Sequence, residues 1–300
     1  MLTRFKNEIP ECTSPYTAPG LKSTQALPEF YQGATADYVK VDGKWVDGMA
    51  QDNMLTALQN LQDAYTAGLI DQEAITNTTS SCRDEWYAGT VGCFPYWGGL
   101  WGETLTVRLK QNVPDAEVIA LPPIEGATYL YSAPSVQVIS SKLSNEQVAS
   151  VFKYFIEYMH DGGEGQVLFQ SGVEGVHWEQ DGNNIKPLPT ISKPAEVFQK
   201  AWITPWLAIT PMTAADKNVE ISQAVSDSLA VVSANAKNIS VFPVSEQRTM
   251  ITSDLTTARE NIISRVAMGQ LTPEEGMAEY KAQAETLNVA QALEEMNANA

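Results

Sequence analysis

The sequence predicts a mixed α/β fold, because short strand-like segments and amphipathic helices are interspersed along the chain. Its 300 residues allow one large domain or two ordinary ones, and 44% of them are hydrophobic, which is enough to build a core. No internal repeat or low-complexity tract interrupts this pattern. We therefore expect a folded α/β or α+β protein.

The first half of the chain carries the expected strands. Residues 38–45 have the pattern of two short strands around an Asp-Gly turn. A further strand begins at residue 91 and runs into a glycine-rich aromatic loop that ends at residue 101. Strands are also expected over 117–121 and 129–140. One helix is expected in this half, over 51–67, because its apolar residues recur at helical spacing.

The second half is predicted to be mostly helical. Ser144 and Gln147 have the spacing of a capping box, which predicts a helix over 145–160. That helix has one apolar face, made of Val148, Val151, Phe152, Phe155 and Met159. The other helices are expected over 164–171, 213–236 and 254–268, from Pro273 onward, and over 288–298.

The charge of the chain excludes several partners. There are 36 acidic and 19 basic residues, a net charge of −17, whereas nucleic-acid phosphates and anionic membranes attract a basic face. No apolar run is long enough to cross a bilayer. The 3 cysteines and 2 histidines disfavour a zinc ribbon or a disulfide scaffold. Cys82 and Cys93 could be bridged across a short loop, but the odd count favours free thiols.

The local sequence contains no catalytic motif. A nucleophile elbow and a phosphate-binding Walker loop are both absent. Glu174 and Glu179 are a candidate pair of carboxylates, but a chain with 36 acidic residues contains such pairs by chance. A solvated acidic surface explains them better. We expect no cofactor and no metal.

The tryptophans are the most informative side chains, because several lie in loops that contain glycine or proline. These are Trp97, Trp101, Trp178, Trp202 and Trp206. An indole in such a loop has few neighbours to bury it, and it can present its face to a ligand. Sugar rings stack on indoles through their apolar C–H side, while their hydroxyls need polar partners. Core packing is the alternative for each ring, and Trp45 and Trp86 are expected to be structural.

Eight segments occur in an order that is typical of one protein family. They are DYVKVDGKW (37–45), LQDAYTAGLID (61–71), GTVG (89–92) leading into Tyr96 and Trp97, NVPDA (112–116), ALPPIEG (120–126), FKYF (152–155), GVEGVHW (172–178) and MGQLT (268–272) with Tyr280. In these segments the chain resembles the extracellular solute-binding proteins of ABC sugar importers. The resemblance is strongest to the lipoprotein branch that is common in Gram-positive bacteria.

The resemblance implies a periplasmic-binding-protein-like fold of type II, in which two α/β lobes are joined by crossing strands and close on a ligand. Residues 1–132 would form the first part of the C-terminal lobe. Residues 133–176 would form a crossing strand and a portion of the N-terminal lobe, and residues 177–300 the helical return to the C-terminal lobe. The family's signal peptide, lipid-anchor cysteine and most of its N-terminal lobe have no counterpart here, so we expect the back part of a longer protein.

The resemblance also implies a function and a site. The protein would be a non-catalytic, extracellular monomer, anchored as a lipoprotein in its full-length form, that delivers a sugar or oligosaccharide to the permease subunits of an ABC importer. Trp97, Trp101 and Trp178 would stack on the sugar, Glu174 and His177 would bind its hydroxyls, and Tyr96 and Trp206 would lie farther out. Two alternatives stay open: a carbohydrate-active hydrolase that uses Glu174 and Glu179, and a truncated fragment that binds nothing.

Overall fold

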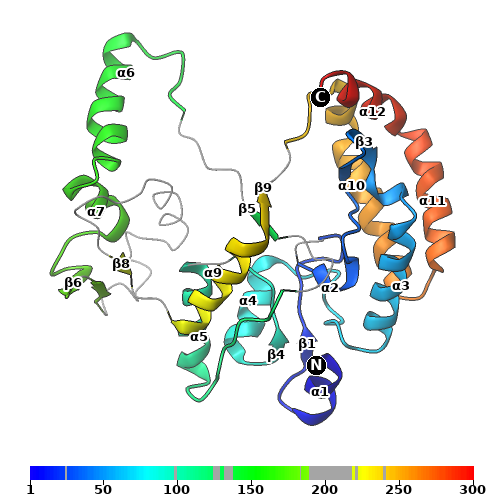
Figure 1. The fold of residues 1–300 in the computed structure, drawn as a ribbon, viewed down its shortest axis with the longest axis horizontal. Coiled ribbons are helices and arrows are strands. Elements are labelled where there is room, and N and C mark those ends of the chain that lie inside the picture. The colour runs from blue at the N-terminus through cyan, green and yellow to red at the C-terminus, as the bar shows by residue number, and fades with distance from the viewer. Residues whose placement is uncertain are drawn as a thin grey trace. The chain divides into compact units, whose positions relative to one another are not determined.

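A computed structural model of the chain describes residues 1–23, 26–97, 100–123, 129–131, 138–182, 184–188, 218–219, 222–238 and 241–300. The chain forms two compact units, and Figure 1 labels many of their elements. Unit 1 comprises Met1–Trp97, Leu105–Tyr131 and Ser228–Ala300, and unit 2 comprises Gly98–Thr104 and Ser132–Asp227. Each unit is therefore assembled from separate stretches of sequence. The three-part division expected from the sequence stays a prediction.

Unit 1 contains most of the helices. Its elements are α1 (Leu2–Glu8), β1 (Ser14–Tyr16), α2 (Pro28–Tyr31), β2 (Tyr38–Val41), β3 (Lys44–Asp47), η1 (Gly48–Ala50), α3 (Asn53–Thr66), α4 (Thr79–Ala88), β4 (Val91–Cys93), β5 (Tyr129–Tyr131), β9 (Ala236–Asn238), α10 (Glu246–Ala267), α11 (Pro273–Thr286) and α12 (Val289–Ala298). Two helices, α5 (Leu100–Asn112) and α9 (Gln223–Asn235), contribute residues to both units.

The strands that the structure describes in unit 1 form three short pairs. β1 and β4 run parallel, with Ser14 opposite Val91. β2 and β3 form the antiparallel hairpin that the Asp-Gly turn predicts, and β5 and β9 run parallel. The parallel pairs join segments that are distant in sequence, which is the arrangement expected when helices connect the strands.

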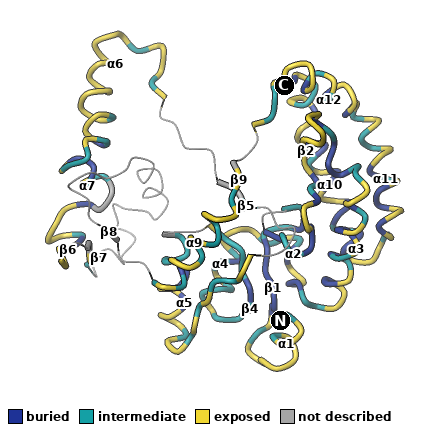
Figure 2. Tube along the Cα trace, viewed as in Figure 1, coloured by how far each residue is buried: buried dark blue, intermediate teal, exposed yellow. Residues whose placement is uncertain are grey.

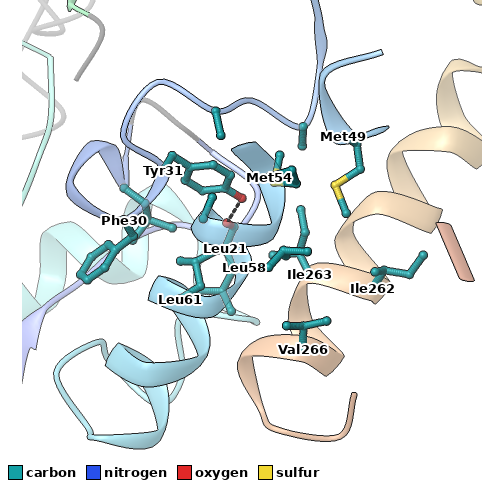
Figure 3. Packing of buried hydrophobic residues seen from close by; sticks show 14 of the residues in the cluster. Leu21, Phe30, Tyr31, Met49, Met54, Leu58, Leu61, Ile262, Ile263 and Val266 are labelled. Atoms are coloured by element: carbon teal, nitrogen blue, oxygen red, sulfur yellow. Dashed lines mark hydrogen bonds between the residues drawn. The ribbon is translucent and has the colours of Figure 1, made fainter. Parts of the chain in front are cut away.

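The core of unit 1 lies between α3 and the C-terminal helices α10 and α11. The apolar side chains of α3 recur at helical spacing, so they share one side of the helix. Figure 3 shows Met54, Leu58 and Leu61 of α3 facing Ile263 and its neighbours on α10. The Tyr31 side chain is also buried in this core, and its hydroxyl donates a hydrogen bond to the Leu21 carbonyl at 2.7 Å.

Unit 2 is smaller. Its own elements are α6 (Asn145–Val151), the π-helical segment η2 (Phe152–Glu157), α7 (Glu164–Ser171), β6 (Trp178–Asp181), β7 (Asn184–Pro187) and β8 (Asn218–Val219). β7 lies between β6, which is antiparallel to it, and β8, which is parallel. None of the helices that the structure describes is both long enough and apolar enough to cross a membrane.

Several helix boundaries follow the sequence signals. The helix predicted over 51–67 is α3. The capping boxes at Ser144 and Thr272 both form, so α6 and α11 begin where predicted. The helix predicted over 254–268 is α10, which starts earlier because Ser245 caps its first turn by accepting a hydrogen bond from the Arg248 N–H.

Other predicted elements need correction. No strand forms over 117–121, which runs into Pro122-Pro123 and pairs with no strand in the described part of the chain. The strand predicted over 129–140 forms only as β5, residues 138–140 are not a strand, and 132–137 lie outside the described residues.

The helices predicted over 145–160 and 213–236 also differ. The first changes into the π-helical η2 after Val151. In the described part of the second, the helix begins at Gln223, whereas Val219 lies in β8 and pairs with Ile185 of β7. Residues 213–217 and 220–221 lie outside the described residues. An isolated apolar residue such as Val219 fits a helical or a strand period equally well, so periodicity alone could not decide.

Candidate functional site

The aromatic segment directly after β4 is the first group of candidate residues, and it belongs to unit 1. The Phe94 ring lies between two others, with ring centroids 6.0 Å from Trp86 and 5.0 Å from Tyr96. The Trp86 indole N–H donates to the Leu105 carbonyl at 3.2 Å, which anchors the group to the start of the α5 portion of unit 1. Trp97, next in the chain, is 58% exposed. The segment therefore offers an uncovered indole beside a fixed row of rings.

Trp101 does not lie in a loop as the glycines before it suggested. It lies in the first turn of α5, where it is half-buried. Glu103 in the same turn favours a helix start, because a carboxylate stabilises the positive end of the helix dipole. The expectation of a loop tryptophan at position 101 is thus corrected to a helical one.

The 172–178 loop of unit 2 is the second group, and Gly172 makes it possible. Gly172 has φ +80°, and a Cβ atom there would lie 2.7 Å from His177 Nδ1. Only glycine fits so close to the ring. The Val173 N–H donates to His177 Nδ1 at 2.9 Å, so the proton of a neutral His177 ring is on Nε2. His177 is half-buried and Glu174 is exposed.

Trp178 faces the interior of unit 2. The side chain is 3% exposed, and its indole N–H donates to the Gly172 carbonyl at 3.0 Å. The Gly175 N–H donates to the Trp178 carbonyl at 2.7 Å, which closes the loop on itself. In this arrangement Trp178 positions the backbone that carries Glu174 and His177.

The second carboxylate of the hydrolase alternative has an ordinary surface environment. Glu179 lies on β6 and is exposed, and its Oε1 is 2.8 Å from the Lys186 ammonium on the neighbouring strand β7. An exposed, salt-bridged carboxylate on a sheet edge is typical of a solvated face.

A largely buried polar cluster in unit 1 brings together Thr17, Asp71, Asn77 and Glu85. Asp71 Oδ2 accepts hydrogen bonds from Asn77 Nδ2 at 2.5 Å and from the Thr17 hydroxyl at 3.3 Å. Asn77 Nδ2 also lies 3.4 Å from Glu85 Oε1, while Glu85 Oε2 is buried without a hydrogen-bond donor. Burial and the neighbouring Asp71 carboxylate raise the pKa of Glu85. A proton on Glu85 therefore relieves the repulsion between the two carboxylates.

The structure thus divides the sequence-predicted residues between the two units. Tyr96 and Trp97 belong to unit 1, and Trp101, Glu174, His177 and Trp178 belong to unit 2. Trp202 and Trp206 lie outside the described residues. Sequence reasoning missed Phe94, although its place between a buried strand and Tyr96 could have indicated it. In the described part of the chain, no three His, Cys, Asp or Glu side chains gather to form a potential metal site.

The chain shares its mixed α/β fold with two solved binding proteins, which confirms the predicted fold class. Over 99% of the chain it is similar to the crystal structure of the alginate-binding protein AlgQ2 without calcium ion, with a TM-score of 0.67 and 16% sequence identity. Over 98% it is similar to an EF-hand mutant of the S. pneumoniae ABC-transporter substrate binding protein FusA in complex with fructo-nystose, with a TM-score of 0.55 and 16% identity.

The chain spans about two thirds of the length of either protein, 66% of AlgQ2 and 65% of FusA. No protein-family model matches the sequence, and no curated protein sequence does either. At 16% identity the likeness establishes the fold.

Proposed function

We propose that the chain is part of a non-catalytic binding protein that takes up an oligosaccharide outside the cell and delivers it to the permease subunits of an ABC importer. One observation carries this proposal: nearly the whole chain shares its fold with two carbohydrate-related binding proteins, one named for alginate and one solved in complex with fructo-nystose. One fold can serve many functions, so the chemistry of the candidate residues must also suit a sugar ligand.

The candidate residues offer the chemistry that a sugar requires. The exposed face of Trp97 can stack on the apolar C–H side of a pyranose or furanose ring. The Nε2–H of His177 is a donor and the exposed Glu174 carboxylate an acceptor, so together they can satisfy both kinds of sugar hydroxyl contact. We propose that Trp101 also stacks on the sugar and that Tyr96 and Trp206 contribute outer contacts. Trp178, which was expected to stack, is buried and instead holds the 172–178 loop in place.

The net charge of −17 favours a neutral oligosaccharide over a uronate polymer, because a strongly acidic protein repels polyanions at long range. As further parts of the proposal, the complete protein is a monomeric lipoprotein of a Gram-positive cell surface, and this chain is its C-terminal portion. The alternative of a hydrolase has less support, since Glu179 is paired with Lys186 at an exposed sheet edge.

The test is a tryptophan-fluorescence titration with neutral fructo-, malto- and xylo-oligosaccharides and with alginate oligosaccharides. We expect a saturable response to a neutral sugar, a loss of affinity of at least tenfold in Trp97→Ala, and recovery of most of that affinity in Trp97→Phe, which keeps a stacking ring. A neutral sugar that binds equally well to Trp97→Ala would contradict the assigned role of Trp97. Silence toward every sugar would favour the non-binding fragment.

A further inference from the structure

The hydroxyl oxygen of Tyr16 lies within hydrogen-bond distance of two acceptors, although the hydroxyl has only one proton. It is 2.9 Å from the Ala26 carbonyl oxygen and 2.5 Å from Glu29 Oε2. A carbonyl oxygen only accepts hydrogen bonds, whereas a phenol oxygen both donates and accepts them. Both contacts can therefore be hydrogen bonds at once only if Glu29 is protonated. Glu29 then donates to Tyr16, and Tyr16 donates to the Ala26 carbonyl.

An ionised Glu29 would leave one of these contacts without a proton. The carboxylate would take the Tyr16 proton, and the Ala26 carbonyl would then face the lone pairs of the Tyr16 oxygen. Tyr16 is 1% exposed and Ala26 is 8% exposed, so water has little access to either residue. A buried acceptor without a donor loses its hydration and gains no bond in exchange. The number of available protons therefore favours the protonated form of Glu29.

The surroundings of Glu29 also favour its neutral form. Burial raises the pKa of Glu29 above 4.5, against the smaller opposing effects of its hydrogen bonds with Tyr16 and with its own backbone N–H. A carboxylate in the first turn of a long helix is stabilised by the helix dipole. However, α2 is a single turn, so its dipole gives an ionised Glu29 little support.

The titratable groups that face Glu29 carry no positive charge. They are Tyr16 of β1 and Cys93 of β4, with Tyr129 of β5 close to Tyr16. Burial, followed by the charge of Glu29, raises the pKa of both Tyr16 and Cys93, so both groups are neutral where Glu29 titrates. The helix packed against α2 is α3, which presents the neutral Asn60 amide to it. No cationic side chain in the described part of the chain lowers the pKa of Glu29.

These hydrogen bonds join two elements of unit 1. Tyr16 is the last residue of β1, which is buried along its whole length, as Figure 2 shows. Glu29 is in the first turn of α2, and the ring of the next residue, Phe30, meets the Tyr16 ring edge-on with centroids 5.3 Å apart. We propose that the folded protein is built around protonated Glu29, so that the hydrogen bonds from Glu29 to Tyr16 and from Tyr16 to Ala26 are a pH-sensitive contact between α2 and β1.

The direction of the pH dependence follows from the raised pKa of Glu29. The stabilisation that protonated Glu29 gives the folded state is complete below pH 4.5, and it is lost as the pH rises through the folded-state pKa of Glu29. The inference concerns unit 1 alone and does not rest on the proposed ligand.

The direct test is carbon-13 NMR of the full chain, labelled at the side-chain carboxyl carbons of its glutamates. The Glu29 signal is the one that disappears in Glu29→Gln, and its titration midpoint gives the folded-state pKa. We expect a midpoint above 4.5. A midpoint at or below 4.5 would mean that ionised Glu29 accepts a hydrogen bond from Tyr16, and it would overturn the proposal.

Thermal melts between pH 4 and pH 8 give a second readout. Glu29→Gln keeps an N–H donor for Tyr16 and cannot ionise, so its melting temperature should increase relative to the parent chain as the pH rises. Glu274→Gln is the matched control, because Glu274 also follows a proline in the first turn of a helix, α11, but is exposed. Its difference from the parent chain should not grow with pH. A deficit of Glu29→Gln that grows with pH, or an equal gain in Glu274→Gln, would contradict the proposal.

Discussion

Arg259 on α10 and Asp47 at the end of β3 are separated by 212 residues in the sequence, yet Nη2 of the arginine lies 2.7 Å from Oδ1 of the aspartate. Both side chains are buried. The Tyr280 hydroxyl of α11 donates to Asp47 Oδ2 at 2.5 Å and accepts from Arg259 Nε at 3.1 Å. This triad fastens the β2–β3 hairpin to the C-terminal helices and so helps to define unit 1.

Removing one partner of this buried pair should be strongly destabilising. Arg259→Leu leaves the Asp47 carboxylate buried with only the Tyr280 hydroxyl as partner, and breaking such pairs typically costs about 3–5 kcal/mol. Arg4→Leu is the matched control, because its pairing with Glu8 is exposed and worth about 0–1 kcal/mol. Urea unfolding followed by tryptophan fluorescence measures both. Equal costs for the two variants would contradict the assigned role of the triad.

The Asp71–Glu85 cluster predicts a pH dependence with a definite sign. The pKa of Glu85 is raised above its ordinary value of 4.5 in the folded state. As the pH rises, the unfolded chain therefore loses the Glu85 proton before the folded chain does. The stabilisation that protonated Glu85 gives the folded state is therefore complete below pH 4.5. It is lost as the pH rises through the folded-state pKa of Glu85. Glu85→Gln should keep the hydrogen bond without the charge and raise the melting temperature at neutral pH.

The matched control for that prediction is Asp84→Asn, which removes one carboxylate from an exposed position on the same helix. Thermal melts between pH 4 and pH 8 should show a smaller decline for Glu85→Gln than for the parent chain and an unchanged decline for Asp84→Asn. A lower melting temperature of Glu85→Gln than of the parent chain at neutral pH would contradict this account. It would mean that a charged Glu85 stabilises the cluster.

Two glycines of the 172–178 loop should differ in the cost of substitution, because Gly172 also has ψ −156°, a backbone region that only glycine adopts readily. Gly172 and Gly175 have similar positive φ values of +80° and +77°, but a Cβ would meet the His177 ring only at Gly172. Gly175→Ala should cost about 1–2 kcal/mol for the left-handed backbone alone. Gly172→Ala should cost more and should shift the NMR signal of the Trp178 indole N–H, because its acceptor is the Gly172 carbonyl. An unshifted indole signal in Gly172→Ala would contradict this account of the loop.

The three cysteines should differ in reactivity. All are unbridged; Cys82 and Cys93 are buried, and Cys12 is half-exposed. Burial, followed by the charge of Glu29, raises the pKa of the Cys93 thiol to about 12, which suppresses the reactive thiolate. Ellman's reagent should therefore modify Cys12 first and Cys82 and Cys93 only on unfolding. Fewer than three thiols after unfolding without reductant would indicate a bridge.

Local patterns in the sequence predicted local structure well. The helical spacing of Met54 and Leu58 predicted α3, and the Ser144 and Thr272 caps predicted two helix starts, because each signal lies within one or two turns of the element it specifies. The exposed position of Trp97 agrees with the prediction for a glycine-rich loop. These are cases in which neighbours in the sequence are also neighbours in space.

Features that depend on distant partners could not be predicted. No pattern near Asp47 predicts its contact with Arg259. No pattern near Trp178 predicts that its indole N–H donates to the Gly172 carbonyl. The glycines before Trp101 predicted a loop, yet α5 starts at Leu100. Whether an indole faces solvent or the interior depends on packing that a linear pattern does not contain.

The central claim is that the protein binds an oligosaccharide without cleaving it. The most direct measurement is isothermal titration calorimetry of the chain with the panel of neutral oligosaccharides, followed by product analysis of each mixture by mass spectrometry. The account predicts saturable binding of at least one neutral sugar and recovery of that sugar intact. Release of shorter sugars, abolished by Glu174→Gln or Glu179→Gln, would contradict it and restore the hydrolase alternative.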